Sequence, residues 1–497
     1  MAFFRVGKIS QNGFENEENV VKNIKYSGEN VVNSLKIFGE NVIMSSRKTV
    51  MKLLKRKIDT YLENWKKDPD HKPLIVKGAR QIGKTKSIEK FGHSNYKYFI
   101  EINFVLQEGY RSIFDDGYEV DSIIKNISFI NSSARFEPGN TLIFFDEIQF
   151  VPKAATSLKS FKLDGRFDVI CSGSLMGINY QEIESNSVGF KTDYEMKSMD
   201  FEEFLWAKGY SEEQIETIFQ HMVNVEPLPN SYFETLDALF RDFIVVGGMP
   251  EIVNKYVEQN NFSGVLQMQR QIIKDYEEDI TKYAGGLDKT KILNVFRKIP
   301  SFLGNENKKF FITKIGKNSR SKDYVGVVDW LVNSGIINIS YCLEYPSLPL
   351  RGHYNPDNFR LYFMDTGLLI GSFDEESQMD LRMNENFNTK KGAIFENIVG
   401  DMLVKSEFEL FFYKDDKGHL EMDFFVRDQD SLIPVEVKSN DGATISLKNL
   451  IGKDKYSDIK FGIKLARKNI GWNGSFYTFP YFLTFLVKRF LAARKKL

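Results

Sequence analysis

A glycine-rich octet near the start of the chain follows an apolar run and opens a helical stretch. The octet, Gly78-Ala-Arg-Gln-Ile-Gly-Lys-Thr85, matches G-x-x-x-x-G-K-T, and residues 73–77 before it read as a short buried strand. The glycines of such a loop let backbone N–H groups wrap phosphates at the N-terminus of the following helix. The segment therefore predicts a phosphate-binding P-loop in an α/β fold, and the flanking strand and helix disfavour a chance match.

Each position of this loop has an expected role toward ATP and Mg²⁺, the two cofactors that the pattern implies. Lys84 is expected to reach the β- and γ-phosphates, and Thr85 to bind Mg²⁺ through its hydroxyl. The expected nucleotide contacts are Gly78, Ala79, Arg80, Gln81, Ile82, Gly83, Lys84, Thr85 and Lys86.

Two further apolar strands end in polar residues that suit the same chemistry. Residues 141–147 end in Asp146, expected to hold Mg²⁺, and Glu147, expected to orient the attacking water. The next strand ends in Ser172-Gly-Ser174, where either serine suits a sensor of the γ-phosphate. We count Glu147, Lys84 and Ser174 as the catalytic residues. The plain alternatives are a buried strand that ends in acids and a tight turn.

A second group of charged residues occurs near the C-terminus. Asp423 lies in one strand-like run, and Glu436 and Lys438 lie two apart in the next. Because side chains two apart share one face of a strand, the pattern fits a PD-(D/E)xK nuclease, with Asp423 and Glu436 sharing Mg²⁺ and Lys438 positioning a water. Glu396, on a preceding helix, is expected as an extra acid. The alternative is a buried ion-pair network in an inactive domain.

The length of 497 residues predicts several domains. The expected fold is α/β: a P-loop parallel sheet, a helical lid, a winged-helix module and a restriction-endonuclease-like α/β domain. Helices followed by a hairpin suggest the winged helix, and lysines and arginines between 314 and 322 make DNA a candidate partner for it. The expected divisions are 1–50 (polar extension), 51–199 (ATPase core), 200–285 (lid), 286–372 (winged helix), 373–390 (linker) and 391–497 (nuclease-like domain).

Taken together, the motifs resemble a family of prokaryotic AAA-type ATPases with a C-terminal domain of unknown function. The resemblance covers roughly residues 51–497 and is carried by Lys77–Thr85, Phe145–Gln149, Ser172–Ser174, Asp200–Leu205, Gly247–Pro250 and Met364–Leu369. It implies an ATPase core, a winged helix and a nuclease-like tail. Where many relatives have Gly-Arg after the sensor strand, this chain has Gly189-Phe-Lys191. An arginine finger therefore stays open among Arg80, Arg166 and Arg241, and Arg80 alternatively pairs with a neighbouring acid.

Composition narrows the classes of partner and the cellular compartment that we expect for this chain. The formal net charge is +0, so no global field draws the chain to nucleic acid, and the two cysteines fit a reducing cytoplasm. No apolar stretch of about 20 residues occurs, so we expect no membrane partner. Two functions are considered. The first is an ATP-driven machine that acts on nucleic acid. The second is a nucleotide-switched signalling or interaction ATPase with an inactive tail, which would bind a protein partner and could form oligomers.

Overall fold

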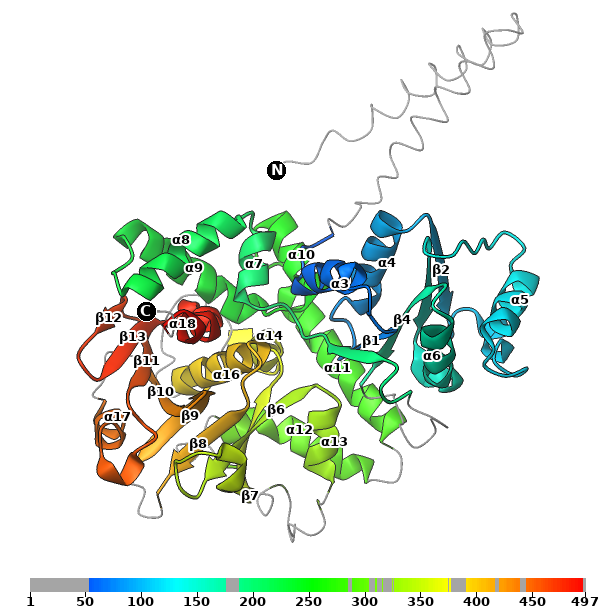
Figure 1. Ribbon diagram of the computed structural model, residues 1–497. Helices are drawn as coiled ribbons and strands as arrows, with labels where there is room; N and C mark the ends of the chain where they lie inside the picture. The colour runs from blue at the N-terminus through cyan, green and yellow to red at the C-terminus, as the bar shows by residue number, and fades with distance from the viewer. Residues whose placement is uncertain are drawn as a thin grey trace, which may run out of the picture. The chain divides into compact units, whose positions relative to one another are not determined.

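The computed structural model describes most of the chain beyond the N-terminal extension. The described residues are 53–175, 187–284, 288–303, 309–310, 315, 324, 326–373, 375–376, 390–415, 420–438 and 444–494. The expected extension (1–50) and most of the expected basic turn (314–322) and linker (373–390) lie outside them. The helices and strands of the described part belong to one unit, residues 54–497 (Figure 1).

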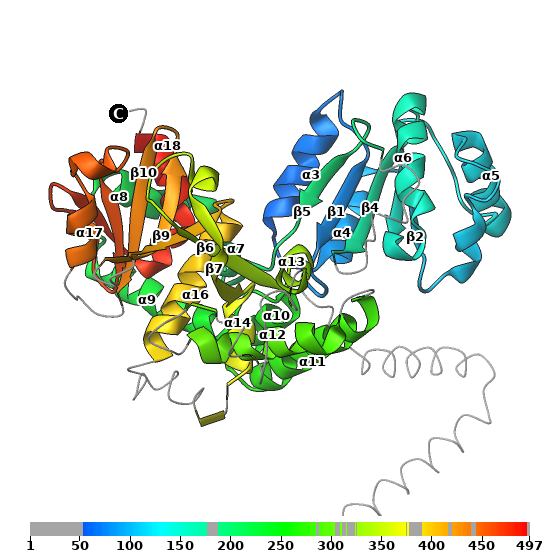
Figure 2. The same cartoon turned by 90° about the horizontal axis from the view of Figure 1, so that it is seen from below.

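The N-terminal half of this unit is built on a parallel sheet. Its strand order is β2-β3-β4-β1-β5, and every pairing is parallel. Figure 2 shows β5, β1, β4 and β2 following one another across it. The bounds are β1 Leu74–Gly78, β2 Tyr98–Asn103, β3 Thr141–Asp146, β4 Asp168–Ser174 and β5 Thr192–Glu195. The expected α/β parallel sheet is confirmed. Strand β5 was not predicted, because Thr-Asp-Tyr-Glu forms no apolar run.

Helices cover both faces of this sheet, because alternate strand residues point to opposite sides. Ile143 and Phe145 pack into one core cluster, whereas Leu142 and Phe144 pack into another. The first cluster lies under α5 (Val120–Ile130) and α6 (Lys153–Asp164), and the second under α3 (Lys57–Lys67) and α4 (Lys84–Asn95). The fully buried strand β3 reads as a continuous apolar run for this reason.

A run of helices follows the sheet, as expected for residues 200–285. The helices are α7 Phe201–Ala207, α8 Glu212–Asn224, α9 Asn230–Val246, α10 Pro250–Gln259 and α11 Val265–Tyr283. Asp200 and Ser211 begin α7 and α8 with capping boxes. The break before α10 needs glycine, because Gly247 has a φ of 74° and a Cβ at Gly248 would overlap the Met199 carbonyl.

The C-terminal half is built on a mixed sheet of eight strands. Their order is β12-β13-β11-β10-β9-β8-β6-β7. The strands are β6 Ile337–Leu343, β7 Tyr354–Phe363, β8 Leu410–Lys414, β9 Glu421–Asp428, β10 Ser431–Lys438, β11 Gly462–Ala466, β12 Gly471–Trp472 and β13 Phe476–Pro480. The accompanying helices are α12 Lys289–Leu303, α13 Val327–Asn333, α14 Thr366–Gly371, α16 Lys390–Lys405, α17 Ile445–Leu450 and α18 Val487–Arg494.

This sheet differs from the expected division between a winged helix and a separate tail. The hairpin β6–β7, expected as a wing, pairs through β6 with β8 in parallel, from Ser340–Leu410 to Leu343–Tyr413. A free strand edge presents unpaired N–H and C=O groups, and β8 satisfies those of β6. The described parts of residues 286–372 and 391–497 therefore share one sheet.

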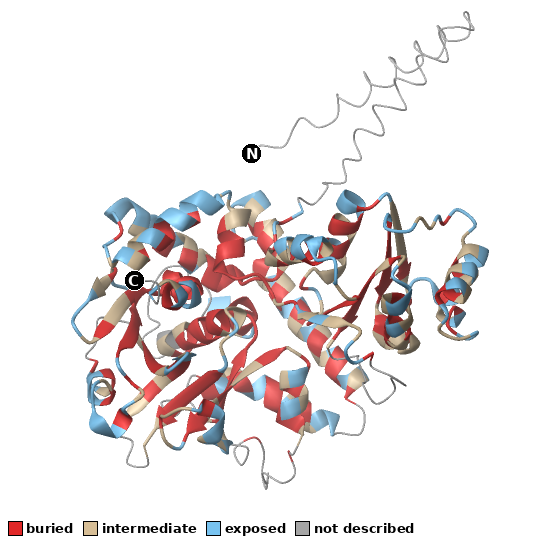
Figure 3. Ribbon diagram, in the orientation of Figure 1, coloured by how far each residue is buried: buried red, intermediate tan, exposed pale blue. Residues whose placement is uncertain are grey.

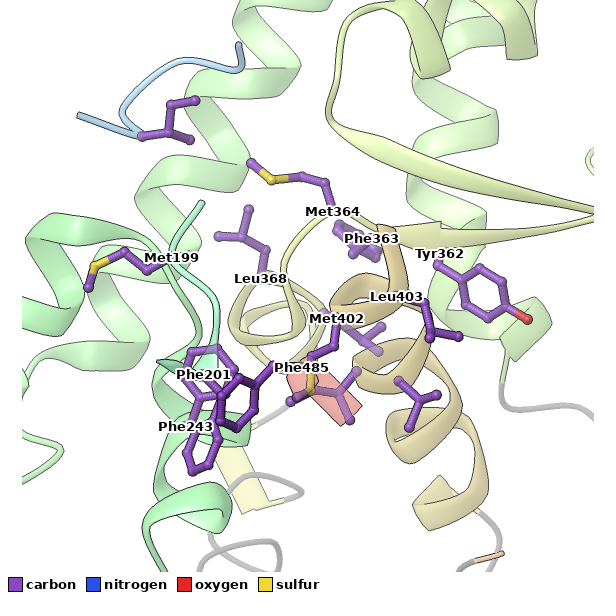
Figure 4. Close-up of a cluster of buried hydrophobic side chains, with 14 of the residues drawn as sticks. Met199, Phe201, Phe243, Tyr362, Phe363, Met364, Leu368, Met402, Leu403 and Phe485 are labelled. Atoms are coloured by element: carbon purple, nitrogen blue, oxygen red, sulfur yellow. The ribbon is translucent and has the colours of Figure 1, made fainter. Parts of the chain in front are cut away.

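The helical region and the C-terminal half also share an apolar core. Phe201 of α7 contacts Phe243 of α9 and Phe485 near the C-terminus, with ring centroids 5.5 and 5.9 Å apart (Figure 4). The basic C-terminal helix α18 lies against α8, where Arg489 pairs with Glu216 at 2.6 Å. The strands of both sheets are largely buried, and the outer faces of α8 and α9 are exposed (Figure 3). The helices of residues 201–283 and the C-terminal half are therefore packed together.

His71 connects the chain before β1 to the start of β4. Its Nε2 lies 2.8 Å from Asp168 Oδ1, and the Tyr96 hydroxyl donates to Asp168 Oδ2 at 2.6 Å. The hydrogen bond to Asp168 raises the pKa of His71, against an opposing effect of burial. A raised pKa stabilises the fold below the unfolded value near 6.5, and this stabilisation is lost as pH rises through the folded pKa.

We therefore expect His71→Gln to destabilise the protein at pH 5.5 by about 1.5–3 kcal/mol, the usual contribution of a hydrogen bond to a charged group. The difference from wild type should shrink above the folded pKa. Thermal unfolding of both proteins across pH 5.5–8.5 measures this, and a gap that widens with pH would contradict it.

Candidate functional site

The P-loop connects β1 to α4 with a backbone that glycine makes possible. A Cβ at Gly78 would overlap the Met196 carbonyl oxygen and the Ile82 side chain. Gly83 has a φ of 92°, in the left-handed region, immediately before α4 begins at Lys84. Ala79 and Ile82 are buried, which anchors the loop to the core. The expected nucleotide contacts thus run from the loop, residues 78–83, into the first turn of α4, which carries Lys84, Thr85 and Lys86. Lys86 pairs with Glu89 at 2.7 Å.

The Lys84 ammonium folds back onto its own loop. It donates to the carbonyl oxygens of Gly78 at 3.0 Å and Ala79 at 2.7 Å. Burial lowers the pKa of Lys84 to about 8, and the nearby carboxylates of Glu147 and Asp146 oppose that shift. A buried ammonium bound to neutral carbonyls gains strongly from an anion, so this position suits a phosphate.

Asp146 is the meeting point of three strand ends. Its carboxylate accepts hydrogen bonds from Thr85 Oγ1 at 3.2 Å, Asn103 Nδ2 at 2.9 Å and the Ser172 hydroxyl. β2, β3 and β4 are parallel, so Asn103, Asp146 and Ser172 reach the same edge of the sheet. The Thr85 hydroxyl and the Asp146 carboxylate are hard oxygen donors side by side, which fits Mg²⁺. Sequence reasoning missed Asn103, although it closes a strand that the sequence located.

Glu147 and Ser174 lie close to this group and differ in how their polar atoms are satisfied. Glu147 has a φ of 59°, and its carboxylate accepts a hydrogen bond from Gln149 Nε2. Ser174 is buried, and its hydroxyl has no hydrogen-bond partner among the residues that the structure describes. Ser172 is occupied with Asp146, so the available hydroxyl at this edge is that of Ser174.

Arg56 supports the loop from outside the motif. Its guanidinium, in a side chain only 6% exposed, donates to Ile82 O at 2.7 Å and Lys197 O at 2.8 Å, and pairs with Glu203 at 2.9 Å. Glu203 in turn forms the capping box of α7 with Asp200. Sequence reasoning missed Arg56, because nothing in the chain before α3 signals a contact with residues 26 and 147 positions away.

The three arginine-finger candidates all have acidic partners. Arg80 Nη1 lies 2.5 Å from Asp279 Oδ1, on helix α11. Arg166 pairs with Asp164 and Asp121, and Arg241 pairs with Asp237 on its own helix. Only Arg80 is part of the P-loop, and the expected alternative for it, pairing with a neighbouring acid, is what the structure shows.

In the C-terminal half, Glu396 is bound within a buried ion pair. Arg360 of β7, 1% exposed, lies 2.8 Å from Glu396 and also pairs with Glu421. The Tyr362 hydroxyl donates to the same Glu396 oxygen at 2.5 Å. Glu396 is thus committed to protein partners, which is the network that the sequence left open as an alternative.

The other three residues of this pattern occupy neighbouring strands, as the spacing predicted. Glu436 and Lys438 of β10 form an ion pair at 2.7 Å, and Asp423 of β9 accepts a hydrogen bond from the Val437 amide at 2.9 Å. Lys464, missed by sequence reasoning, stands opposite Glu436 on β11. Glu436 Oε2 is buried without a hydrogen-bond partner among the described residues, and burial raises the pKa of Glu436.

These carboxylates do not assemble into a larger cluster. Across the part of the chain that the structure describes, no group of three or more His, Cys, Asp or Glu side chains could hold a metal ion. A metal here would therefore rely on Asp423 and Glu436 without Glu396.

Comparison with protein families identifies the nucleotide-binding part. Residues 70–205 match an AAA domain, so this part of the chain is an AAA-type P-loop ATPase domain. Residues 237–377 match a domain of unknown function (DUF8612), and residues 391–481 match another (DUF4143). The first of these begins inside the expected lid and ends beyond the expected winged helix. A search of curated proteins finds no match.

Solved structures show loose likeness at low sequence identity. The Walker-type ATPase PABY2304 of Pyrococcus abyssi has a TM-score of 0.40 and 11% identity, over 66% of this chain and 97% of that one. The RuvB Holliday junction branch migration motor of Thermotoga maritima has 0.29 and 10%, over 67% and 96%. The ORC1 protein of Aeropyrum pernix, solved in complex with DNA, has 0.28 and 12%, over 68% and 95%. At these TM-scores no property of those proteins carries over.

None of the helices in the described part of the chain is long and apolar enough to span a bilayer.

Proposed function

We propose that this protein binds ATP with Mg²⁺ at the P-loop and hydrolyses it. The observation that carries the proposal is the joining of Thr85, Asn103 and Ser172 on the Asp146 carboxylate, at the sheet edge beside Lys84. A phosphate-binding ammonium, a hydroxyl and a carboxylate at one edge are the parts that phosphoryl transfer from ATP requires.

In this proposal each residue does one task. The amides of residues 78–85 and the Lys84 ammonium hold the phosphates, and Thr85 and Asp146 hold the metal. Bound Mg²⁺ would neutralise charge that develops on the phosphates. Glu147 orients the attacking water and accepts its proton, and the Ser174 hydroxyl donates to the γ-phosphate. The unpartnered Ser174 hydroxyl supports its role.

The finer proposal is that hydrolysis drives action on nucleic acid through the C-terminal sheet. Its support is the group of Asp423, Glu436, Lys438 and Lys464 on adjacent strands, in which the Glu436 Oε2 atom has no hydrogen-bond partner among the described residues and would be available to a cation or a water. Asp423 and Glu436 would bind the metal, and Lys438 would stabilise charge on the phosphate.

The second candidate is a nucleotide-switched interaction ATPase with an inactive tail. The commitment of Glu396 to Arg360 and Tyr362 favours it, because that acid is then lost to catalysis. The packing of lid and tail also favours it, since nucleotide state could then change a protein-binding surface.

One experiment separates these possibilities. ATP turnover is measured alone and with branched, duplex and single-stranded DNA, with Lys84→Ala as the blank and the DNA products run on a denaturing gel in Mg²⁺. We expect Lys84→Ala to abolish turnover. Stimulation by DNA, with nicks that disappear in Glu436→Ala, would support the nuclease proposal. Turnover that is indifferent to DNA, with no cleavage, would favour the interaction ATPase, and no turnover in wild type would reject both.

A further inference from the structure

Helix α11 contacts the P-loop at Arg80 and Gln81, the two residues that precede the buried Ile82 of the loop. Besides the ion pair with Asp279, Arg80 donates to the Tyr283 hydroxyl at 2.8 Å, and its carbonyl accepts from the Tyr276 hydroxyl at 2.9 Å. The next residue, Gln81, donates to Asp275 at 2.7 Å. One face of α11 thus contacts two successive residues of the loop with side chains spaced by about one helical turn.

Asp279 places a negative charge against a loop that must bind an anion. Its side chain is only 7% exposed, and its Oδ2 atom has no hydrogen-bond partner among the described residues. Burial raises the pKa of Asp279, while the positive charges of Arg80 and Lys282 oppose that shift. Arg80 and Lys84 belong to the same P-loop motif, and the Arg80 charge adds to the effect of burial in lowering the pKa of Lys84.

The Arg80 guanidinium can therefore bind either the Asp279 carboxylate or the phosphates of a nucleotide. A guanidinium in the P-loop is a strong phosphate ligand when it is free, because it donates several N–H groups in a fixed plane. When Arg80 is paired with Asp279, the positive charge of its guanidinium is neutralised. The Asp279 carboxylate then places negative charge beside the loop that would bind the negatively charged triphosphate.

We infer that Asp279 is an autoinhibitory counterion of the P-loop, which ATP must displace from Arg80 in order to bind. This inference rests on the proposed nucleotide binding and names its regulation. α11 also packs along α14 of the C-terminal half. The contacts of Tyr276 and Asp275 with the loop do not involve the Arg80 guanidinium, so the inferred displacement concerns the Arg80–Asp279 pair alone.

The test compares ATP affinity in full-length variants by calorimetry with Mg²⁺. We expect Asp279→Asn, which keeps the shape and removes the charge, to lower the Kd for ATP about tenfold, or about 1.4 kcal/mol. In an Arg80→Gln background the same substitution should give a smaller gain. Glu277→Gln is the matched control, because Glu277 lies on the same helix and pairs with Arg297 instead of the loop. It should leave the Kd unchanged.

A second measurement does not require ATP binding. Hydrogen exchange of residues 78–83 without nucleotide should be faster in Asp279→Asn than in wild type, because the loop loses its ionic contact with α11. Unchanged exchange, an unchanged or raised Kd in Asp279→Asn, or an equal gain in Glu277→Gln would each overturn the inference. If wild type fails to bind ATP, the proposed function fails. In that case, faster exchange in Asp279→Asn would still show that Asp279 restrains the loop, and unchanged exchange would reject the restraint in addition to the proposed function.

Discussion

Replacing Glu147 by glutamine should reduce ATP turnover by about 10²–10⁴-fold while leaving ATP binding intact. Glu147 directly follows Asp146, the proposed metal ligand, and its backbone is left-handed, with a φ of 59°. Its carboxylate is held by Gln149 and lies outside the loop that binds phosphate. The amide of glutamine keeps the size and the hydrogen bonding but accepts no proton from water, so only the chemical step should suffer.

Two measurements check this prediction. Steady-state phosphate release gives the turnover, and titration with ATP in Mg²⁺ gives the Kd, which should stay within about twofold of wild type. Glu137→Gln is the matched control, since Glu137 pairs with Lys97 on the surface and should have no effect on either quantity. Turnover in Glu147→Gln above a tenth of the wild-type value would remove Glu147 from the catalytic role.

The second large effect is expected on stability, in the C-terminal half. Arg360 is 1% exposed, stacks on Phe412 with its guanidinium 4.1 Å from the ring centroid, and pairs with Glu396 and Glu421. Burial disfavours its charge, yet the two carboxylates raise the pKa of Arg360 overall. Arg360→Met would leave the buried Glu396 carboxylate without its guanidinium partner, while the Tyr362 hydroxyl would still donate to it. We expect a loss of about 3–5 kcal/mol.

Denaturant unfolding of the full chain, followed by hydrogen exchange in β7, β8 and β9, locates and measures this loss. Adding Glu396→Gln should restore part of it, because a neutral amide replaces the stranded charge. Arg351→Met is the control: its ion pair with Glu409 is 78% exposed on the arginine side, so its loss should change the free energy of unfolding far less than the loss of Arg360. Equal losses in the two arginine variants would show that burial does not set the cost.

Other parts of the fold were only partly predictable from the sequence, and the expected winged-helix module illustrates why. The apolar runs that became β6 and β7 were located correctly as strands. Which strand pairs with β6 depends on a segment about 70 residues later in the chain, β8. An apolar pattern indicates that a strand is buried on one face, but it does not show which other strand pairs with its free edge. The sequence pattern therefore led us to expect the hairpin in a separate module.

The candidate nuclease group shows the same division. The period of two correctly placed Glu436 and Lys438 on one face of β10, where they form an ion pair. Lys464 could not be found from local pattern, because its position opposite Glu436 follows from the parallel pairing of β10 with β11. The commitment of Glu396 to Arg360 likewise depends on α16 packing against β7.

The sequence by itself determined the P-loop, the strand that carries Asp146 and the parallel sheet around them, because each rests on local spacing: glycines where the backbone needs them and apolar runs that end in polar residues. The tertiary structure alone decided which side chains hold those parts. Arg56 reaches the loop from before α3, Asp279 reaches it from α11, and Asn103 joins Asp146 across the sheet. These contacts join residues tens to hundreds of positions apart, and a charged side chain carries no local sign of the partner that burial will force on it.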